Sequence, residues 1–280
     1  MIIDFHTHIF PPEIVSRHLN CSGKDACFDL LYSDPKARMI SAEELVRNMD
    51  DQGIDVSVAL NIGWSSHELC QLTNDYIIDA VNRFPGRLIG FCAVQPLAGQ
   101  KAIDEIKRCA RYGIKGIGEL RCDTQGFDLT DREAMSPLVE AAMRHNLIIL
   151  THASEPVGHT YTGKGEISPG ILYRFIQNFP AQLLVCAHWG GGLPFYALMP
   201  EMAAAMKNVY FDTAASPFLY RDEVFLHVAD ILGADKILFG SDHPLIRQDR
   251  IVKAVMSLPM PEASKKAILG DNASRLLSLN

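Results

Sequence analysis

Short apolar, β-branched segments alternate with segments of helical periodicity from one end of the chain to the other. The expected strands occupy residues 2–6, 54–61, 87–94, 114–120, 147–152, 182–188, 209–213 and 236–241. Successive strands start 27 to 35 residues apart, about the length of one strand–helix unit, except for a first gap of 54 − 2 = 52 residues. Eight such units predict a single α/β domain over residues 1–280, a TIM (β/α)8 barrel distorted by an insertion at 11–40 after the first strand. We expect this insertion to lie over the barrel mouth as a loop or lid.

A doubly wound open sheet is the alternative fold, but no glycine-rich nucleotide-binding loop follows the first strand. Helix-terminating residues agree with the alternating pattern. Ser41 and Glu44 fit a capping box at the start of a helix that is expected to end at Gly53. Ser136 and Pro137 are typical of an N-cap followed by a proline in the first turn, so a second helix is expected to start there.

Composition excludes several classes of protein. Apolar residues make up 48% of the chain and the net charge is 26 − 33 = −7, which excludes a disordered chain and disfavours nucleic-acid binding. The seven cysteines are scattered without a C-x-x-C pair, which indicates a reducing compartment. The N-terminal sequence MIIDFHTHIF does not resemble a signal peptide, and no segment has the roughly 20 apolar residues that span a bilayer. We therefore expect a cytoplasmic protein that acts on a small molecule, without a membrane or nucleic-acid partner.

Histidines and carboxylates gather at the carboxyl ends of the expected strands. In a (β/α)8 barrel these ends form the active site. Residues i and i+2 of a strand share a face, so His6 and His8 are both expected to point into the mouth. Imidazoles combined with carboxylates favour Zn²⁺, with Mn²⁺ or Fe²⁺ as alternatives. The other candidates at strand ends are Glu119, His152, His188 and Asp242.

Five motifs spread along the whole chain carry a family resemblance: IIDFHTHIFP, LTHASEP, CAHWGGGLPF, FGSDHP and ILGDNASRLL. In these motifs the chain resembles the amidohydrolase superfamily, and within it the amidohydrolase-related branch that includes aminocarboxymuconate-semialdehyde decarboxylase. The resemblance implies a divalent metal held by His6, His8, His152 and Asp242, with His188 acting in the chemistry. It also suggests a homodimer.

Glu119 leaves the number of metal ions open. In two-metal members of the superfamily a carboxylated Lys or a Glu at the end of the fourth strand bridges the ions. The stretch GIGELR resembles that strand in TatD-type nucleases, and His188 would then join the second metal. The alternative is that Glu119 pairs with Arg121, which lies two residues further on the same strand face. One or two ions therefore remain possible at this stage.

The leading functional prediction is a metal-dependent hydrolase. A metal-bound hydroxide would attack the carbonyl of an amide, lactone or ester in a small anionic substrate. Asp242 would move the proton, and His188 would polarise the electrophile or stabilise the developing oxyanion. The alternative is a metal-dependent, non-oxidative decarboxylase of an unsaturated or aromatic acid. A non-catalytic barrel is the third reading, and the intact set of candidate ligands counts against it.

Substrate contacts are predicted from position and side-chain type. Arg121 follows Glu119 at a strand end and would bind an anionic group. Trp64 and Trp189 would form an aromatic wall, and His159 belongs to a polar loop after the fifth strand. Asp4 shares the parity of His6 and His8, so it is expected to accept a hydrogen bond from one of their imidazoles.

Overall fold

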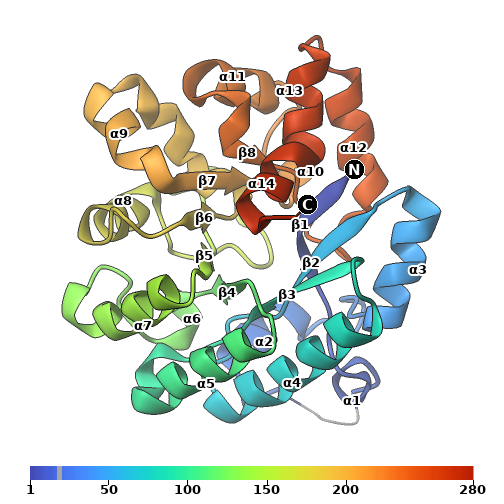
Figure 1. Ribbon diagram of the computed structural model, residues 1–280, viewed down its shortest axis with the longest axis vertical. Coiled ribbons are helices and arrows are strands. Elements are labelled where there is room, and N and C mark those ends of the chain that lie inside the picture. Colours follow the sequence, from blue (N-terminus) through green and yellow to red (C-terminus); the bar gives the residue numbers. More distant parts are fainter. Residues whose placement is uncertain (18–20, 280) are drawn as a thin grey trace.

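The computed structural model describes residues 1–17 and 21–279. Eight parallel strands follow one another in chain order inside a ring of helices (Figure 1). Main-chain hydrogen bonds from Phe5 N to Phe239 O (2.7 Å) and from Asp242 N to His6 O (2.9 Å) join the end of the strand order to its start. The predicted (β/α)8 barrel is confirmed. Its strands are β1 (Ile3–His8), β2 (Val56–Leu60), β3 (Leu88–Cys92), β4 (Gly116–Leu120), β5 (Ile148–Thr151), β6 (Leu184–Cys186), β7 (Val209–Asp212) and β8 (Ile237–Leu238).

The outer layer consists mainly of seven helices: α3 (Ala42–Gln52), α4 (His67–Arg83), α5 (Gln100–Arg111), α7 (Arg132–Arg144), α8 (Pro169–Asn178), α11 (Val224–Leu232) and α12 (Gln248–Ser257). Shorter helices are α1 (Pro12–Val15), α2 (Ala26–Tyr32), α6 (Cys122–Gln125), α9 (Pro200–Ala205), α10 (Ser216–Leu219), α13 (Glu262–Lys266) and α14 (Asn272–Leu277). Tighter or wider turns are η1 (Pro96–Ala98), η2 (His188–Leu198), η3 (Met206–Asn208), η4 (Ala234–Lys236) and the π-type η5 (Ala267–Asp271). Among the described residues no helix combines the length and the apolar character needed to cross a membrane.

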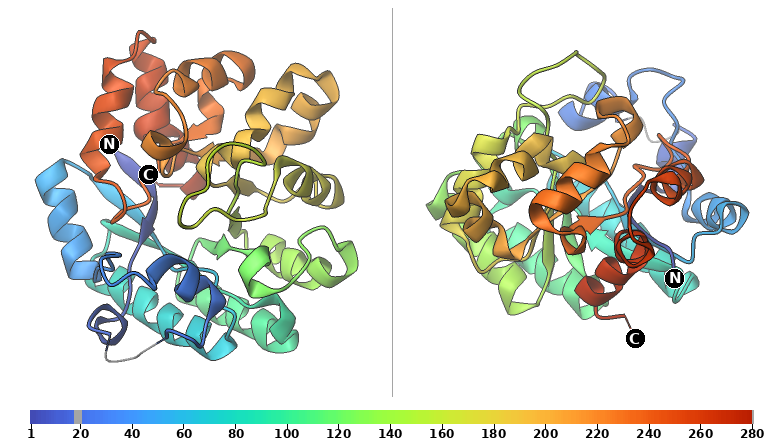
Figure 2. Two further views of the ribbon diagram at one scale, coloured as in Figure 1. Left: turned by 180° about the vertical axis from the view of Figure 1, so that it is seen from behind. Right: turned by 90° about the horizontal axis from the view of Figure 1, so that it is seen from above.

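The expected insertion lies between β1 and α3 and contains α1 and α2. In the right-hand view of Figure 2, the blue insertion and the yellow-green segment that follows β5 rise at one end of the barrel, away from the two chain termini. The carboxyl ends of the strands open toward the same end, because this segment leaves β5 there. The insertion is therefore placed where it can contribute to the mouth.

Helix capping was predicted correctly at one of the two positions. The Glu44 amide donates to Ser41 Oγ (3.3 Å), and α3 ends at Gly53, whose φ of 71° is a left-handed conformation that glycine adopts easily. The prediction that a helix starts at Ser136 is wrong. The Asp131 side chain caps α7 more than a turn earlier, and Pro137 lies inside the helix. A carboxylate at the N-cap is the stronger start signal because it accepts a main-chain hydrogen bond and also favours the helix dipole.

Apolar side chains fill the barrel from within. Phe5, Val58, Phe91, Leu150 and Val185 belong to one buried cluster, in which the rings of Phe5 and Phe91 meet edge to face at 5.7 Å. A larger cluster packs the outer faces of the strands against the helices. Because the interior is filled by apolar groups, the buried histidines and carboxylates of the strands gather toward the carboxyl ends, apart from Asp4 near the start of β1.

Candidate metal centre

The first strand carries an irregularity just before its two histidines. Asp4 pairs with Ser57 and Thr7 pairs with Ala59, so β1 has one more residue than β2 between these pairs. A bulge of this kind reverses the alternation of side chains beyond it. The Asp4 carboxylate accepts hydrogen bonds from Ser241 Oγ and, at 2.8 Å, from Gln248 Nε2. It contacts no imidazole ring among the described residues. The prediction that Asp4 supports a histidine ring is therefore wrong.

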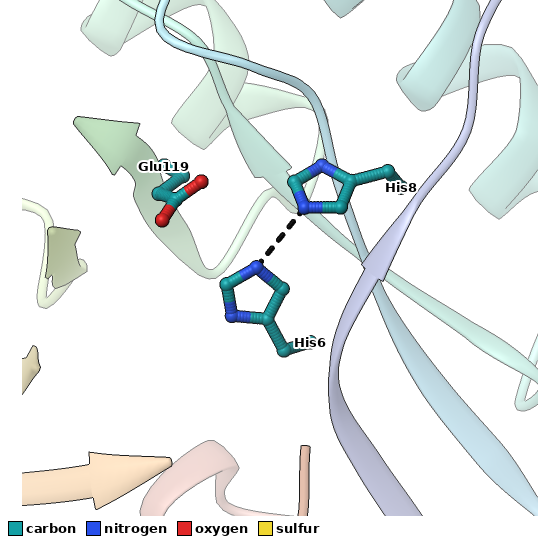
Figure 3. A group of neighbouring side chains, drawn as sticks. All are labelled: His6, His8 and Glu119. Atoms are coloured by element: carbon teal, nitrogen blue, oxygen red, sulfur yellow. Dashed lines mark hydrogen bonds between the residues drawn. The ribbon is translucent and has the colours of Figure 1, made fainter. Parts of the chain in front are cut away.

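His6 and His8 meet at the barrel mouth as predicted. Their Nε2 atoms lie 3.0 Å apart, and His8 Nε2 lies 3.1 Å from Asp242 Oδ1. His6 Nε2 is 3.8 Å from the same oxygen. Figure 3 shows the two imidazoles of β1 facing each other, with the Glu119 carboxylate of β4 beside them. One ligand atom from each of His6, His8 and Glu119 lies within 4.8 Å of the other two.

Glu119 also belongs to a second group, with His152 and His188. Glu119 Oε1 lies 2.9 Å from His152 Nδ1 and 3.5 Å from His188 Nε2. The ligand atoms of these three residues again lie within 4.8 Å of one another. Glu119 thus joins the two groups, and the predicted strand-end residues converge on one small volume.

The alternative pairing of Glu119 with Arg121 is not found. Arg121 Nε lies 3.5 Å from Asp123 Oδ1, and its guanidinium donates to Gly163 O. The fourth strand has an extra residue between Ile117 and Leu120, where its pairing with β5 shifts register. This irregularity breaks the simple alternation on which the expected pairing depended.

Burial and charge act against each other in this centre. Burial alone would lower the pKa of the His6 imidazole, but the charges of Asp212, Glu119 and Asp242 raise it to about 10. Burial alone would raise the pKa of Glu119, but the neighbouring histidines, His152 foremost, hold it well below the usual range. The carboxylates therefore attract positive charge strongly, and a metal ion can replace the protons that the imidazoles would otherwise hold.

The donor set fits a divalent metal ion. Two imidazole nitrogens that face each other at 3.0 Å cannot both donate, and a cation placed near them accepts both lone pairs. Carboxylate oxygens of Glu119 and Asp242 complete a mixed nitrogen and oxygen set suited to Zn²⁺, Mn²⁺ or Fe²⁺. The residues at these strand ends form a site for a divalent metal.

Asp212, at the end of β7, was missed by the sequence analysis. Its Oδ2 lies 2.9 Å from His6 Nδ1, and its Oδ1 accepts the main-chain amide of His188 at 3.0 Å. A carboxylate on the far nitrogen of a metal-binding histidine fixes the ring orientation and raises its basicity. The signal was present, because Asp212 is the last residue but one of the seventh predicted strand, but its sequence neighbours do not show which ring it faces.

His188 and Asp242, the two residues predicted to act in catalysis, share a backbone feature. Their φ angles are 54° and 66°, in the left-handed region that side chains other than glycine rarely adopt. His188 Nδ1 contacts Ala214 O at 3.1 Å, which directs Nε2 toward Glu119. Such conformations concentrate at functional sites, where the surrounding structure holds them in place.

The centre opens into a cavity of about 610 Å³. Arg121 and His159 line it, as predicted, although only 1% of Arg121 is exposed. The insertion contributes several lining residues, so its expected place at the mouth is confirmed, while its movement as a lid stays a prediction. Lys36 and Arg38 of the insertion line the cavity too, and the lining residues that the sequence analysis missed include Tyr32, Phe218 and Leu245. No local signal distinguishes these loop residues from their neighbours.

The predicted aromatic wall is wrong for both tryptophans. Each has no exposed surface, because each indole packs into the core. Trp64 stacks on Phe28 at 5.9 Å and donates to Asn61 Oδ1. Trp189 packs edge to face on Phe225 at 5.0 Å and donates to Ser216 Oγ at 2.6 Å. A large ring with a satisfied N–H is more stable in the core than in an open cavity.

Two curated relatives match nearly the whole chain. The 2-amino-3-carboxymuconate-6-semialdehyde decarboxylase of Dictyostelium discoideum is 20% identical over 99% of this chain and 92% of its own length. The gamma-resorcylate decarboxylase of Polaromonas sp. is 23% identical over 89% of this chain and 91% of its own length. Both are decarboxylases, so the leading prediction of a hydrolase is wrong. Strand-end ligands are common to both reactions, which is why they did not distinguish hydrolysis from decarboxylation.

Solved structures and a family model agree on the fold. The 5-carboxyvanillate decarboxylase of Sphingomonas paucimobilis has a TM-score of 0.79 at 18% identity, covering 100% of this chain and 99% of its own. That of Novosphingobium aromaticivorans, solved in complex with manganese, has a TM-score of 0.83 at 20% identity and covers 100% of this chain and 96% of its own. The amidohydrolase family model matches residues 3–279. This chain therefore belongs to the amidohydrolase family.

Proposed function

We propose that this protein is a metal-dependent, non-oxidative decarboxylase of a small unsaturated or aromatic carboxylic acid. The observation that carries the proposal is the match of two decarboxylases along nearly the whole chain, combined with a divalent-metal site at the barrel mouth. The cavity above that site, about 610 Å³, has room for one substituted ring or a muconate-like chain.

The residues proposed to hold the metal are His6, His8, His152 and Asp242. A divalent ion supplies positive charge that holds a substrate carboxylate and stabilises negative charge as the reaction proceeds. Glu119 contacts both groups of candidate ligands, so it is the residue that would hold a second ion. Mn²⁺ is supported by the manganese in the Novosphingobium neighbour, and Zn²⁺ and Fe²⁺ suit the same donors.

His188 is the proposed proton donor. When the bond to the departing carboxylate breaks, its electron pair stays on the substrate carbon, which must then take a proton. Burial alone would lower the pKa of His188, but the hydrogen bond and charge of Glu119 and the charge of Asp242 raise it, so the ring has a proton to give. Neighbouring imidazoles keep the pKa of Asp242 far below its usual range despite its burial, so this carboxylate is a poor proton source. This difference supports His188 over Asp242.

Arg121 is proposed to bind a second polar or anionic group of the substrate. Its guanidinium lines the metal cavity. Burial, and after it the positive charge of Arg121, lower the pKa of His152 to about 4. A neutral imidazole is the form that binds metal. His159, at the rim of the same cavity, is proposed as a further contact.

A homodimeric state, a cytoplasmic location and the lack of a nucleic-acid partner stay predictions.

The experiment that tests the function measures carbon dioxide release from a panel of hydroxybenzoates, vanillate-type acids and muconate-type acids, with matched amides, lactones and esters assayed for hydrolysis. Metal content is measured by elemental mass spectrometry on the same preparation. We expect decarboxylation that a chelator abolishes and that Asp242→Asn and His188→Asn lower at least 100-fold. Hydrolysis without carbon dioxide release, or unchanged activity after the metal is removed, would overturn the proposal.

A further inference from the structure

A second cavity, of about 440 Å³, lies next to the metal cavity. It is formed by the segment after β5, the turn η2 and the segment around α10. The two cavities share His159, Tyr161 and Leu219 in their walls. We refer to this second cavity as the recess. The described residues of its walls include no lysine or arginine, and Glu155 is the one acidic residue among them.

The Glu155 carboxylate has two tyrosine hydroxyls as its polar neighbours. Its Oε2 accepts a hydrogen bond from the Tyr161 hydroxyl at 2.9 Å. Its Oε1 has no partner at hydrogen-bond geometry within the described part of the chain, and the Tyr220 hydroxyl also interacts with this carboxylate. Lys164 belongs to the same segment, but its ammonium donates to Val157 O (2.9 Å) and His159 O (3.1 Å). No ion pair to Glu155 is found among residues 1–17 and 21–279. A half-buried carboxylate without a cationic partner attracts a positively charged ligand.

Aromatic rings make up much of the remaining wall: Tyr161, Phe195, Tyr196 and Tyr220. The rings of Phe195 and Tyr220 lie 6.3 Å apart at an angle of 50°. Burial, and then the charge of Glu155, raise the pKa of Tyr161 and of Tyr220, so both phenols stay neutral. Neutral aromatic faces attract an organic cation through their quadrupole.

We propose that the recess binds a primary ammonium group carried on a small organic ligand. The Glu155 carboxylate supplies the opposite charge, and the aromatic rings surround the carbon skeleton. An anionic ligand is disfavoured because Glu155 repels it and no wall cation offsets that repulsion. A bare metal ion is disfavoured too, since the recess offers a single carboxylate where a metal needs several ligands. This inference stands independently of the proposed decarboxylation.

Calorimetric titration with benzylammonium tests the proposal, using benzyl alcohol and benzoate as neutral and anionic counterparts. We expect the wild-type protein to bind benzylammonium at least tenfold more tightly than either counterpart. Glu155→Gln keeps the shape but removes the charge, so it should weaken binding at least tenfold. Glu166→Gln removes one charge from the same segment at an exposed position outside the recess and should leave binding within twofold. Equal binding by Glu155→Gln and wild type overturns the proposal.

Two further measurements keep the test decisive. If Glu155→Gln does not fold, as judged by circular dichroism, the ranking of the three probes on the wild-type protein decides, and no preference for benzylammonium overturns the proposal. The source of the ammonium is tested with 4-(aminomethyl)benzoate. Binding that is tighter than that of benzylammonium supports an ammonium at the far end of a carboxylate ligand that reaches from the metal cavity. Equal binding supports a separate amine. Both results require the same loss in Glu155→Gln.

Discussion

Glu119 at the end of β4 and Glu105 on α5 are both buried, with exposed fractions of 5% and 2%. The Glu119 carboxylate faces two imidazoles, with His152 Nδ1 at 2.9 Å. The Glu105 carboxylate accepts from Arg108 at 2.7 and 2.8 Å and from Asn74 at 2.8 Å. In both residues these partners outweigh burial and lower the pKa.

The difference lies in what the partners can exchange. Arg108 is always charged, and Asn74 also binds the main chain of Ala93, so Glu105 ties α5 to α4 and β3 and has no role left for a ligand. The partners of Glu119 are imidazoles that can release protons and bind a metal instead. A buried carboxylate is thus structural or functional according to its partners, and burial alone does not distinguish the two.

Glu119→Gln gives the largest expected effect. The amide cannot balance the positive charge that gathers at the metal centre, so we expect a loss of activity of at least about 100-fold and a lower metal content. Carbon dioxide release and elemental mass spectrometry measure both. Glu105→Gln is the control and should keep activity within about threefold. Equal activity losses in the two variants would show that the partners of these two carboxylates do not separate a functional from a structural role.

Asp212→Asn is expected to lower activity or metal affinity by about 10 to 100-fold, because His6 Nδ1 loses its anionic partner. Asp4→Asn is the matched control, since Asp4 is equally buried but contacts Ser241 and Gln248 instead of an imidazole. Metal titration of both variants measures the effect. If Asp4→Asn weakened metal binding as much as Asp212→Asn, the reversal of side-chain direction by the β1 bulge would be contradicted.

Glu105→Gln is expected to lower the free energy of unfolding by about 2 kcal/mol at pH 7. Burial alone would raise the pKa of Glu105, but the hydrogen bonds from Arg108 and Asn74 lower it to about 2. A folded pKa below the unfolded value stabilises the protein above the unfolded pKa, and this contribution is lost as the pH falls through the folded one. Urea unfolding should therefore show a smaller difference between the two proteins at pH 3 than at pH 7. A constant difference would contradict the assignment.

Trp64→Phe is expected to have the smallest effect, a loss of about 1 kcal/mol in stability from the lost hydrogen bond and reduced packing. The KM should stay within about twofold of wild type, because Trp64 lies outside the metal cavity. Thermal unfolding and steady-state kinetics measure both quantities. A KM raised more than tenfold at unchanged stability would restore the predicted aromatic wall.

The sequence alone determined the barrel and the set of strand-end residues that meet at its mouth. Apolar runs at regular spacing require parallel strands joined by helices, and the carboxyl ends of such strands meet at one end of the barrel. His6, His8, Glu119, His152, His188 and Asp242 therefore had to converge, whatever their separation in the chain. Hydrolysis and decarboxylation can use the same set of metal ligands. The sequence therefore predicted where the reaction takes place but did not distinguish the two reactions.

Only the tertiary structure decided the partners of individual side chains. The extra residues in β1 and β4 are visible only against their neighbouring strands, and they separate Asp4 from His6 and Glu119 from Arg121. The burial of both tryptophans depends on which side chains pack over them. The recess around Glu155 depends on three segments of the chain that come together only in the fold. A strand pattern reports the period of one segment, whereas register and burial are properties of the contacts between segments.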